Sequence, residues 1–257
     1  MQHTPTEEAA KFVPQLIDYD AFKSWIVVED DAVLVVDKPG WVVCHPSKNG
    51  PLSSLVGVAK LHTGLETLHL VSRLDRETSG IVLFAKHRKA ARELQMAFQE
   101  RQVDKTYLAI VEGELKDAVE VNAPLAKDLV SPVAAKVAVR ASRTAKNAQT
   151  RFEPLARGGG FSLLRVTPVT GRKHQIRAHA QHLGHCIVGD KLYGKDDSLF
   201  LEFIEHGWTA RLDQNLAMHR QALHAQTICR SGQWSYSAPL PADMRGFCLA
   251  HGVAVVS

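Results

Sequence analysis

The 257-residue sequence lacks the features that mark membrane-spanning, secreted and disulfide-stabilised proteins. No apolar run approaches the roughly 20 residues that a helix needs to cross a bilayer. The opening stretch, MQHTPTEEAAKF, is polar and partly acidic, whereas a secretory signal is basic and then apolar. The four cysteines are far apart and form no C-x-x-C pair, which indicates free thiols and neither a disulfide framework nor a zinc site. We therefore expect a cytoplasmic protein with no membrane association.

The motifs of several common enzyme classes are missing too. There is no G-x-S-x-G, which the nucleophile of an α/β-hydrolase requires. There is no G-x-G-x-x-G after the first predicted strand, as a dinucleotide-binding fold requires. The glycine run at residues 157–160 is not followed by Gly-Lys-Ser/Thr, so it predicts a turn and not a phosphate-binding loop.

The charges that are present are unevenly distributed. The formal net charge is only +4, but residues 136–177 carry ten basic residues and one acidic residue, Glu153. The first 35 residues carry seven acidic residues and two lysines. This segregation favours one basic face that could follow a phosphate backbone. On charge alone, a solvated face without a partner is equally compatible.

Dense runs of β-branched residues, cut by acidic and Pro-Gly turns, predict mainly strands. Strands are expected within residues 25–46, 81–85, 106–115, 161–171, 185–194 and 220–241, with weak strands and connections over 117–160. The spacing of apolar residues predicts helices over 87–102 and 172–184, and residues 51–64 are ambiguous between a short helix and a loop. Because strands and helices do not alternate regularly, the expected fold class is α+β, with a mixed, mostly antiparallel central sheet and flanking helices.

The loop VSRLDRETSG (71–80) places Asp75 between Arg73 and Arg76, just before a strand that is apolar on both faces. One interpretation is a surface ion pair at a turn. The other is a nucleophile, because nearby guanidinium groups favour the ionised carboxylate and a carboxylate can attack an electrophilic carbon. As an isolated pattern the loop favours the structural interpretation.

Five motifs in a fixed order carry a family resemblance. VSRLDRETSGIVLFAK is similar to the signature of the RluA-type pseudouridine synthases, His-Arg-Leu-Asp-x-x-Thr-Ser-Gly followed by an apolar strand. The other four matching segments are VEDDAVLVVDKPGWVVCHP (28–46), KTYLAIVEG (105–113), the Thr-Gly-Arg-x-His-Gln-Ile-Arg segment within 166–194, and RQALHA (220–225). Together they cover about residues 25–240.

The resemblance implies a role for each matching residue. Asp75 is the expected nucleophile, acting on a uridine flipped out of its RNA, with Tyr107 packed against the target base and Arg177 paired with the carboxylate. Further basic residues are expected to contact RNA: Arg73, Arg76, Arg172 and Lys173. No metal or cofactor is expected, since the reaction needs none. The steps of three between His179, His182 and His185 also suit helix-face residues near RNA or solvent better than metal ligands.

The resemblance also implies a domain layout, with an N-terminal arm over residues 1–24 and one catalytic domain over 25–257. Many relatives carry a small S4-like RNA-binding module first, and 24 residues are too few for one. RNA recognition is therefore expected from the catalytic domain and from insertions such as residues 195–212, which can also be interpreted as a helical cover over the core. Ser72 stands where the family usually has histidine, which is expected to change how the loop meets the RNA backbone.

The expected function is the conversion of specific uridines to pseudouridine in structured rRNA or tRNA, by a monomer. One alternative is a catalytically silent RNA-binding module on the same fold. Another is a glycosidase-like enzyme acting on a free nucleoside, which would need a second carboxylate that the matched motifs do not supply. The sequence leaves three routes open for Asp75: addition to ribose C1′, addition to the base, or elimination to a glycal.

Overall fold

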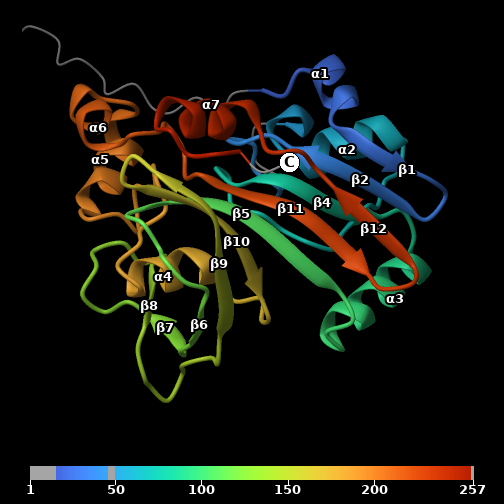
Figure 1. Cartoon of the computed structure of the whole chain (residues 1–257). Coiled ribbons are helices and arrows are strands. Elements are labelled where there is room, and N and C mark those ends of the chain that lie inside the picture. The colour runs from blue at the N-terminus through green and yellow to red at the C-terminus, as the bar shows by residue number, and fades with distance from the viewer. Residues whose placement is uncertain (1–15, 46–49, 256–257) are drawn as a thin grey trace, which may run out of the picture.

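A ten-stranded sheet organises the computed structural model, which describes residues 16–45 and 50–255 (Figure 1). Eight strands pair in the order β1 (Ile26–Glu29), β2 (Val33–Lys38), β4 (Ser79–Ala85), β11 (Leu223–Arg230), β5 (Asp104–Glu112), β10 (Phe161–Pro168), β9 (Gln149–Gly158) and β6 (Val119–Asn122). At the side, β3 (His69–Leu70) pairs with β4, and β12 (Trp234–Ser237) pairs with β11. The β4–β11 pairing is parallel and the other pairings are antiparallel. The predicted fold class is confirmed.

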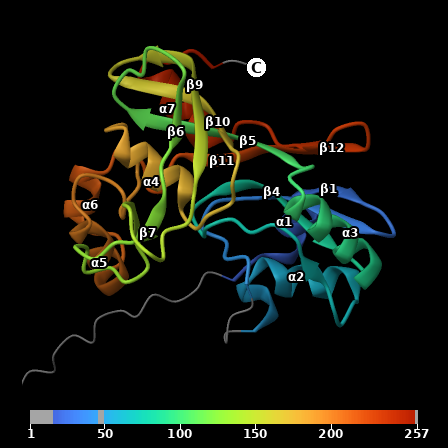
Figure 2. The ribbon, with the colours of Figure 1, turned by 90° about the horizontal axis from the view of Figure 1, so that it is seen from below.

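Helices flank both ends of this sheet. They are α1 (Tyr19–Ser24), α2 (Leu55–Thr63), α3 (Arg88–Gln99), α4 (Gln175–His182), α5 (Ser198–His206), α6 (Ala210–Asn215) and α7 (Ala242–Ala250). A separate two-stranded sheet joins β7 (Leu125–Lys127) to β8 (Val137–Val139). Figure 2 shows α4 and β7 towards one end of the molecule and α2 and α3 towards the other. Over the residues that the structure describes, no helix is both long and apolar enough to span a membrane.

Strand alternation builds two cores on opposite faces of β2 and β4, where Figure 1 shows α2 on one side and α3 on the other. Successive strand residues point to opposite faces. Leu34 and Val82 accordingly pack with α1 and α2, while Val35 and Leu83 pack with α3. β4 is therefore buried along its whole length, as predicted for residues 81–85.

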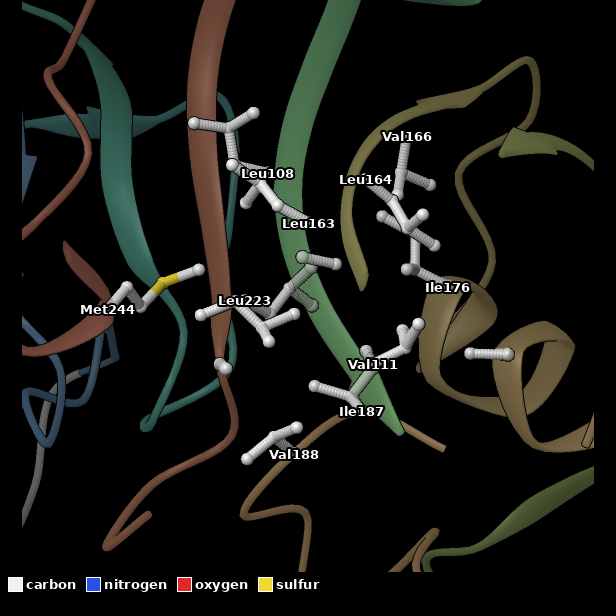
Figure 3. Close-up of a cluster of buried hydrophobic side chains, with 14 of the residues drawn as sticks. Leu108, Val111, Leu163, Leu164, Val166, Ile176, Ile187, Val188, Leu223 and Met244 are labelled. Atoms are coloured by element: carbon white, nitrogen blue, oxygen red, sulfur yellow. The ribbon is translucent and has the colours of Figure 1, made fainter. Parts of the chain in front are cut away.

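A third core joins β5, β10 and β11 to α4 and α7 (Figure 3). Val111 and Leu163 lie in its centre, Ile176 comes from α4, and Met244 comes from α7. Burying apolar area stabilises a fold by about 25 cal/mol per Å², so this core fixes α4 on β10. The orientation of α4 matters because its first turn carries Arg177.

Several predicted elements are confirmed. The helices over 87–102 and 172–184 form as α3 and α4, and Gly184 follows α4 with a left-handed φ of 77°. The ambiguous segment 51–64 is helical as α2, and the hairpin within 220–241 forms as β11 and β12.

Three predictions were wrong. Residues 41–45 form no strand, because Trp41 turns the chain with a φ of 72° and Cys44 packs into the core. Residues 185–194 make one bridge, Ile187 to Val111, and then turn at Gly189. The region 117–160 holds more than weak strands, since β9 runs for ten residues inside the main sheet. Its apolar pattern is weak because much of β9 is only partly buried. The helix α7 was not predicted at all.

The two segments assigned to an arm and to an insertion pack against the domain where they are described. Residues 1–15 of the predicted arm lie outside the described residues, and α1 buries Phe22 in the core beside α2. Residues 195–212 form α5 and begin α6, which share a small cluster with Trp41 and Trp208. This is the helical cover that one interpretation required; contact of the segment with RNA stays a prediction.

The substitution Gly80→Ala tests the close approach of the parallel strands β4 and β11. Its φ is +109°, and a Cβ atom at this position would lie 2.2 Å from the carbonyl oxygen of Ala225. We expect Gly80→Ala to lower the free energy of unfolding by about 3 kcal/mol or more, from backbone strain and overpacking together. Urea denaturation measures the change.

The matched control is Gly246→Ala in α7, where a Cβ meets nothing within 4 Å. Because alanine is the better helix former, this variant should gain about 0.5–1 kcal/mol. Equal stability of Gly80→Ala and the wild type would contradict the close packing of β4 on β11.

Candidate active site

The sequence-predicted residues converge on one cavity between the 71–78 loop, β5, the end of β10 and the start of α4. The cavity has a volume of about 110 Å³. Five of the seven predicted site residues line it: Arg73, Asp75, Tyr107, Arg172 and Arg177. They come from three segments that are far apart in the sequence.

Arg177 holds the Asp75 carboxylate from one side. Its Nη1 donates to Asp75 Oδ2 at 2.8 Å, while Nε and Nη2 donate to the two carboxylate oxygens of Asp190 at 2.6 and 2.8 Å. The guanidinium also lies over the ring of Tyr193, 4.8 Å from its centroid. A forked pair of this kind fixes orientation as well as charge. Arg177 therefore presents its Nη1 group to Asp75 in a fixed place.

The electrostatics keep Asp75 ionised and accessible. Burial by itself raises the pKa of the Asp75 carboxyl, but the charge and hydrogen bond of Arg177 outweigh it, and the pKa lies below the ordinary aspartate value. The Asp75 side chain is 36% exposed, compared with 9% for Arg177 and 0% for Asp190. Of the three charged groups, Asp75 is thus the one that a ligand can reach.

Tyr107 and Lys105 stand two residues apart on β5, so both face the cavity. Burial and the charge of Asp75 raise the pKa of the Tyr107 hydroxyl to about 12, so the ring is neutral at physiological pH. Burial lowers the pKa of Lys105. Lys105 was not among the predicted site residues, although its spacing from Tyr107 places both on one face of the strand.

The backbone of the 71–78 loop is held at four successive carbonyl groups. The donors are Cys44 Sγ to Leu74, Thr78 N to Asp75, Lys38 Nζ to Arg76 and Arg220 Nη1 to Glu77, at 3.4, 3.2, 3.1 and 3.2 Å. Lys38 and Arg220 are buried cations, and burial lowers the pKa of Lys38 to about 8. Since the donors come from other segments or from within the turn, the loop is tied to its surroundings along its length.

A buried lysine, Lys191, also holds the Glu77 side chain of this loop. Lys191 Nζ donates to Glu77 Oε2 at 3.0 Å and to the His219 carbonyl at 2.7 Å. Its charge is surrounded by three aromatic rings, Trp41, Phe203 and Trp208, with centroids 4.8, 5.0 and 5.3 Å away. Because Phe203 belongs to α5, this ammonium group joins the helical cover to the 71–78 loop.

Two of the predicted RNA-contacting residues lie away from the cavity wall. The guanidinium of Arg76 stacks over Trp41 and Phe203, at 5.2 and 5.5 Å from the ring centroids. Lys173 is exposed next to the cavity-lining Arg172. Contacts of both residues with RNA stay predictions.

Ser72 and the clustered histidines have structural partners. Ser72 Oγ accepts a hydrogen bond from the Leu83 backbone N–H at 3.1 Å, so this position supports β4. His179 is not a solvent-facing or RNA-facing residue, as its spacing suggested. It is fully buried, with ring nitrogens 2.8 Å from Thr150 Oγ1 and 3.0 Å from the Ala123 carbonyl. Across residues 16–45 and 50–255, no three His, Cys, Asp or Glu side chains gather as metal ligands would.

A larger cavity of about 920 Å³ lies between α7, the 38–41 turn and residues 217–220. It contains none of the seven predicted site residues. The small cavity is the better candidate active site, because an ionised carboxylate, a locked guanidinium and an aromatic ring converge there.

Comparisons with known proteins give one family. A family model described as RNA pseudouridylate synthase matches residues 32–182. Ribosomal large subunit pseudouridine synthase C of Vibrio vulnificus is 40% identical over 204 residues, and its Escherichia coli K12 counterpart is 39% identical over 189. These matches cover 79% and 73% of this chain but only 60% and 58% of the two relatives.

Solved structures give the same family. Human RNA pseudouridylate synthase domain containing 4 superposes with a TM-score of 0.73 at 25% identity, covering 93% of this chain and 97% of the human chain. Human RNA pseudouridylate synthase domain containing 1 has a TM-score of 0.67 at 24% identity, covering 88% and 84%, and shows the shared fold.

Replacing Lys191 with methionine tests whether this lysine holds the 71–78 loop in place. The variant leaves the Glu77 carboxylate without its buried cation, and we expect a loss of about 3 kcal/mol in the free energy of unfolding, measured by urea denaturation. Lys195→Met is the matched control. Lys195 is 85% exposed and pairs with Glu112 at the surface, so its loss should change stability by less than about 1 kcal/mol. Similar stability of the two variants would contradict a structural role for Lys191.

Proposed function

The chain belongs to the RNA pseudouridylate synthase family, and from this premise we propose that it converts uridine to pseudouridine in large-subunit ribosomal RNA, with Asp75 as the nucleophile. The family model covers 151 of the 257 residues, which confirms the resemblance expected from the five motifs. The relatives in Vibrio vulnificus and Escherichia coli K12 are named for the large ribosomal subunit, which makes that RNA the first substrate to test.

One observation carries the proposal: Asp75 is an ionised, accessible carboxylate fixed by a guanidinium that is itself locked by Asp190. The isomerisation breaks the bond from N1 to ribose C1′ and forms a bond from C5 to C1′. The C5 proton leaves and N1 gains a proton, so nothing is oxidised or reduced. Asp75 would act in each of the three routes, by adding to C1′, by adding to the base, or by removing the C2′ proton on the way to a glycal.

The size of the cavity suits the base of one extruded nucleotide. At about 110 Å³ it is smaller than the pockets of about 300–1,000 Å³ that enclose drug-sized ligands. Taking a base out of a helical stack costs a few kcal/mol, and packing against Tyr107 would offset part of this. The basic residues at the rim, Arg73, Arg172 and Lys173, would hold the flanking phosphates.

The surroundings of Asp190 weigh against the nucleoside-hydrolase alternative. Asp190 is the nearby carboxylate that could serve as an acid, but it is fully buried and both its oxygens accept from Arg177. Burial raises the pKa of Asp190, but the charge and hydrogen bonds of Arg177 lower it by more, so the pKa lies below the ordinary aspartate value. The group therefore stays ionised and cannot donate a proton. The silent-module alternative is addressed by the first experiment below. We further propose that the protein acts in the cytoplasm and as a monomer.

Asp75→Asn should abolish pseudouridine formation, with a loss of at least about 1000-fold in the single-turnover rate, because the amide is no nucleophile. The measurement is pseudouridine mapping of rRNA and tRNA from cells that lack the protein, complemented with wild-type or variant. Asp104→Asn, an exposed change at the start of β5, is the control and should restore modification. A full set of pseudouridines in cells without the protein, together with no activity of the purified enzyme on rRNA or tRNA, would reject the enzymatic function.

RNA affinity should fall as salt rises, because phosphate contacts release counterions. Arg172→Ala should weaken binding to every RNA tested and reduce the slope of log Kd against log salt by about 1. Arg245→Ala, in the exposed part of α7, should leave the slope unchanged. Filter-binding titrations at several salt concentrations compare the two, and equal slopes for both variants would remove Arg172 from the RNA-contacting surface.

A further inference from the structure

His174 lines the cavity, and none of the three proposed routes gives it a role. It precedes α4 with φ 52° and ψ 21°, in the left-handed region, which is uncommon for residues other than glycine. Such strained residues persist where the surrounding structure holds them, and they gather at functional sites. The contacts of the imidazole show what holds His174 in this conformation.

Tyr193 fixes the protonation of this imidazole. The Tyr193 hydroxyl oxygen accepts the Val137 backbone N–H at 3.0 Å and lies 2.9 Å from His174 Nδ1. Among the described residues, Nδ1 is the one acceptor within reach of the single hydroxyl proton. The hydroxyl therefore donates to Nδ1, and the proton of the neutral ring is on Nε2. Burial and the charge of Arg177 lower the pKa of His174 to about 4, so the ring is neutral at physiological pH.

The Nε2–H group faces the nucleophile across a gap. Nε2 lies 3.9 Å from Asp75 Oδ2, which is too far for a direct hydrogen bond. An oxygen atom placed between them can lie about 2.8 Å from both. Such an atom must accept from Nε2–H and donate to the ionised carboxylate. A hydroxyl group does both, whereas a carbonyl oxygen cannot donate.

An internal uridine of RNA has one hydroxyl group, the ribose 2′-OH. Its oxygen is bonded to C2′, next to the C1′ atom at which the glycosidic bond breaks, so it comes close to Asp75 in any of the three routes. The uracil edge around N3 also offers a donor beside acceptors. That edge points away from C1′ and C6, so it cannot face Asp75 while the carboxylate reacts.

We propose that His174 and Asp75 together bind the 2′-hydroxyl of the target uridine, with Nε2–H donating to the 2′-oxygen and the hydroxyl donating to Asp75 Oδ2. The pair would select ribose over deoxyribose at the target, since the 2′-OH is the group that distinguishes RNA from DNA. Tyr193 is the positioning residue that sets the tautomer. This inference rests on the proposed function and adds the part of the substrate that His174 reads.

The experiment compares two unreactive oligonucleotides that span the mapped uridine and carry pseudouridine or 2′-deoxypseudouridine at that position. Their inhibition constants are measured against the labelled substrate oligonucleotide. The wild type should bind the ribose form about tenfold or more tightly, as expected for a hydrogen bond to a charged group. His174→Asn should reduce this ratio to within about threefold, because asparagine tolerates the left-handed backbone but does not reach as far. Tyr193→Phe, which keeps the ring but not its fixed tautomer, should reduce the ratio by less.

Three outcomes would overturn the inference: a wild type that binds both sugars equally, a His174→Asn variant that weakens both oligonucleotides to the same extent, or a Tyr193→Phe variant with an unchanged ratio. If His174→Asn does not fold, Tyr193→Phe decides alone. Failure of the proposed function would look different, because the wild-type enzyme would then convert no uridine in any rRNA or tRNA, and the assignment of His174 would fall with it.

Discussion

The guanidinium of Arg177 is the interaction on which the site depends. Asp190 takes two of its donors in a forked pair, the ring of Tyr193 covers its face, and its Nη1 group is aimed at Asp75. A single buried cation between two carboxylates leaves one negative charge in excess. Because Asp190 is closed off, that charge is presented at Asp75, the one carboxylate that a substrate can reach. Asp190 is therefore as necessary as Arg177 to the placement of Asp75, although it is closed off from the cavity.

The arginines beside Asp75 in the sequence do not form its ion pair. Arg73 lines the rim of the cavity, and Arg76 turns to the rings of Trp41 and Phe203. The partner of Asp75 is 102 residues away on another element. The carbonyl groups of Arg76 and Glu77 instead accept hydrogen bonds from Lys38 and Arg220, which come from other segments and fix the backbone of the loop. Arg177 thus holds the carboxylate of Asp75, while Lys38 and Arg220 hold the backbone of the loop that carries it.

The predictable parts of the molecule are those with a strong local pattern. β4 and β5 are continuous apolar runs, α3 and α4 have a period near 3.6 residues, and the order of the family motifs placed Asp75, Tyr107 and Arg177 in one site. Lys191, Asp190 and His174 were missed because their roles arise from contacts between distant loops, which leave no periodic signal. β9 was underestimated for a related reason, since a strand that is partly exposed has few apolar residues to alternate. The helix α7 has a glycine in its middle, which weakens its helical pattern.

The rigidity of the loop decides which partner must change shape when RNA binds. Four successive carbonyl groups are hydrogen-bonded, and leaving one buried polar group unpaired costs about 1–3 kcal/mol. Moving Asp75 towards a stacked base would break several of these bonds at once, whereas flipping one nucleotide costs only a few kcal/mol. The cheaper motion is that of the RNA. The parallel pairing of β4 with β11 strengthens this conclusion, because it joins the end of the loop directly to the strand beside Tyr107. In the proposed reaction the RNA therefore comes to a preformed site, and selection between uridines rests on which of them the RNA can release at low cost.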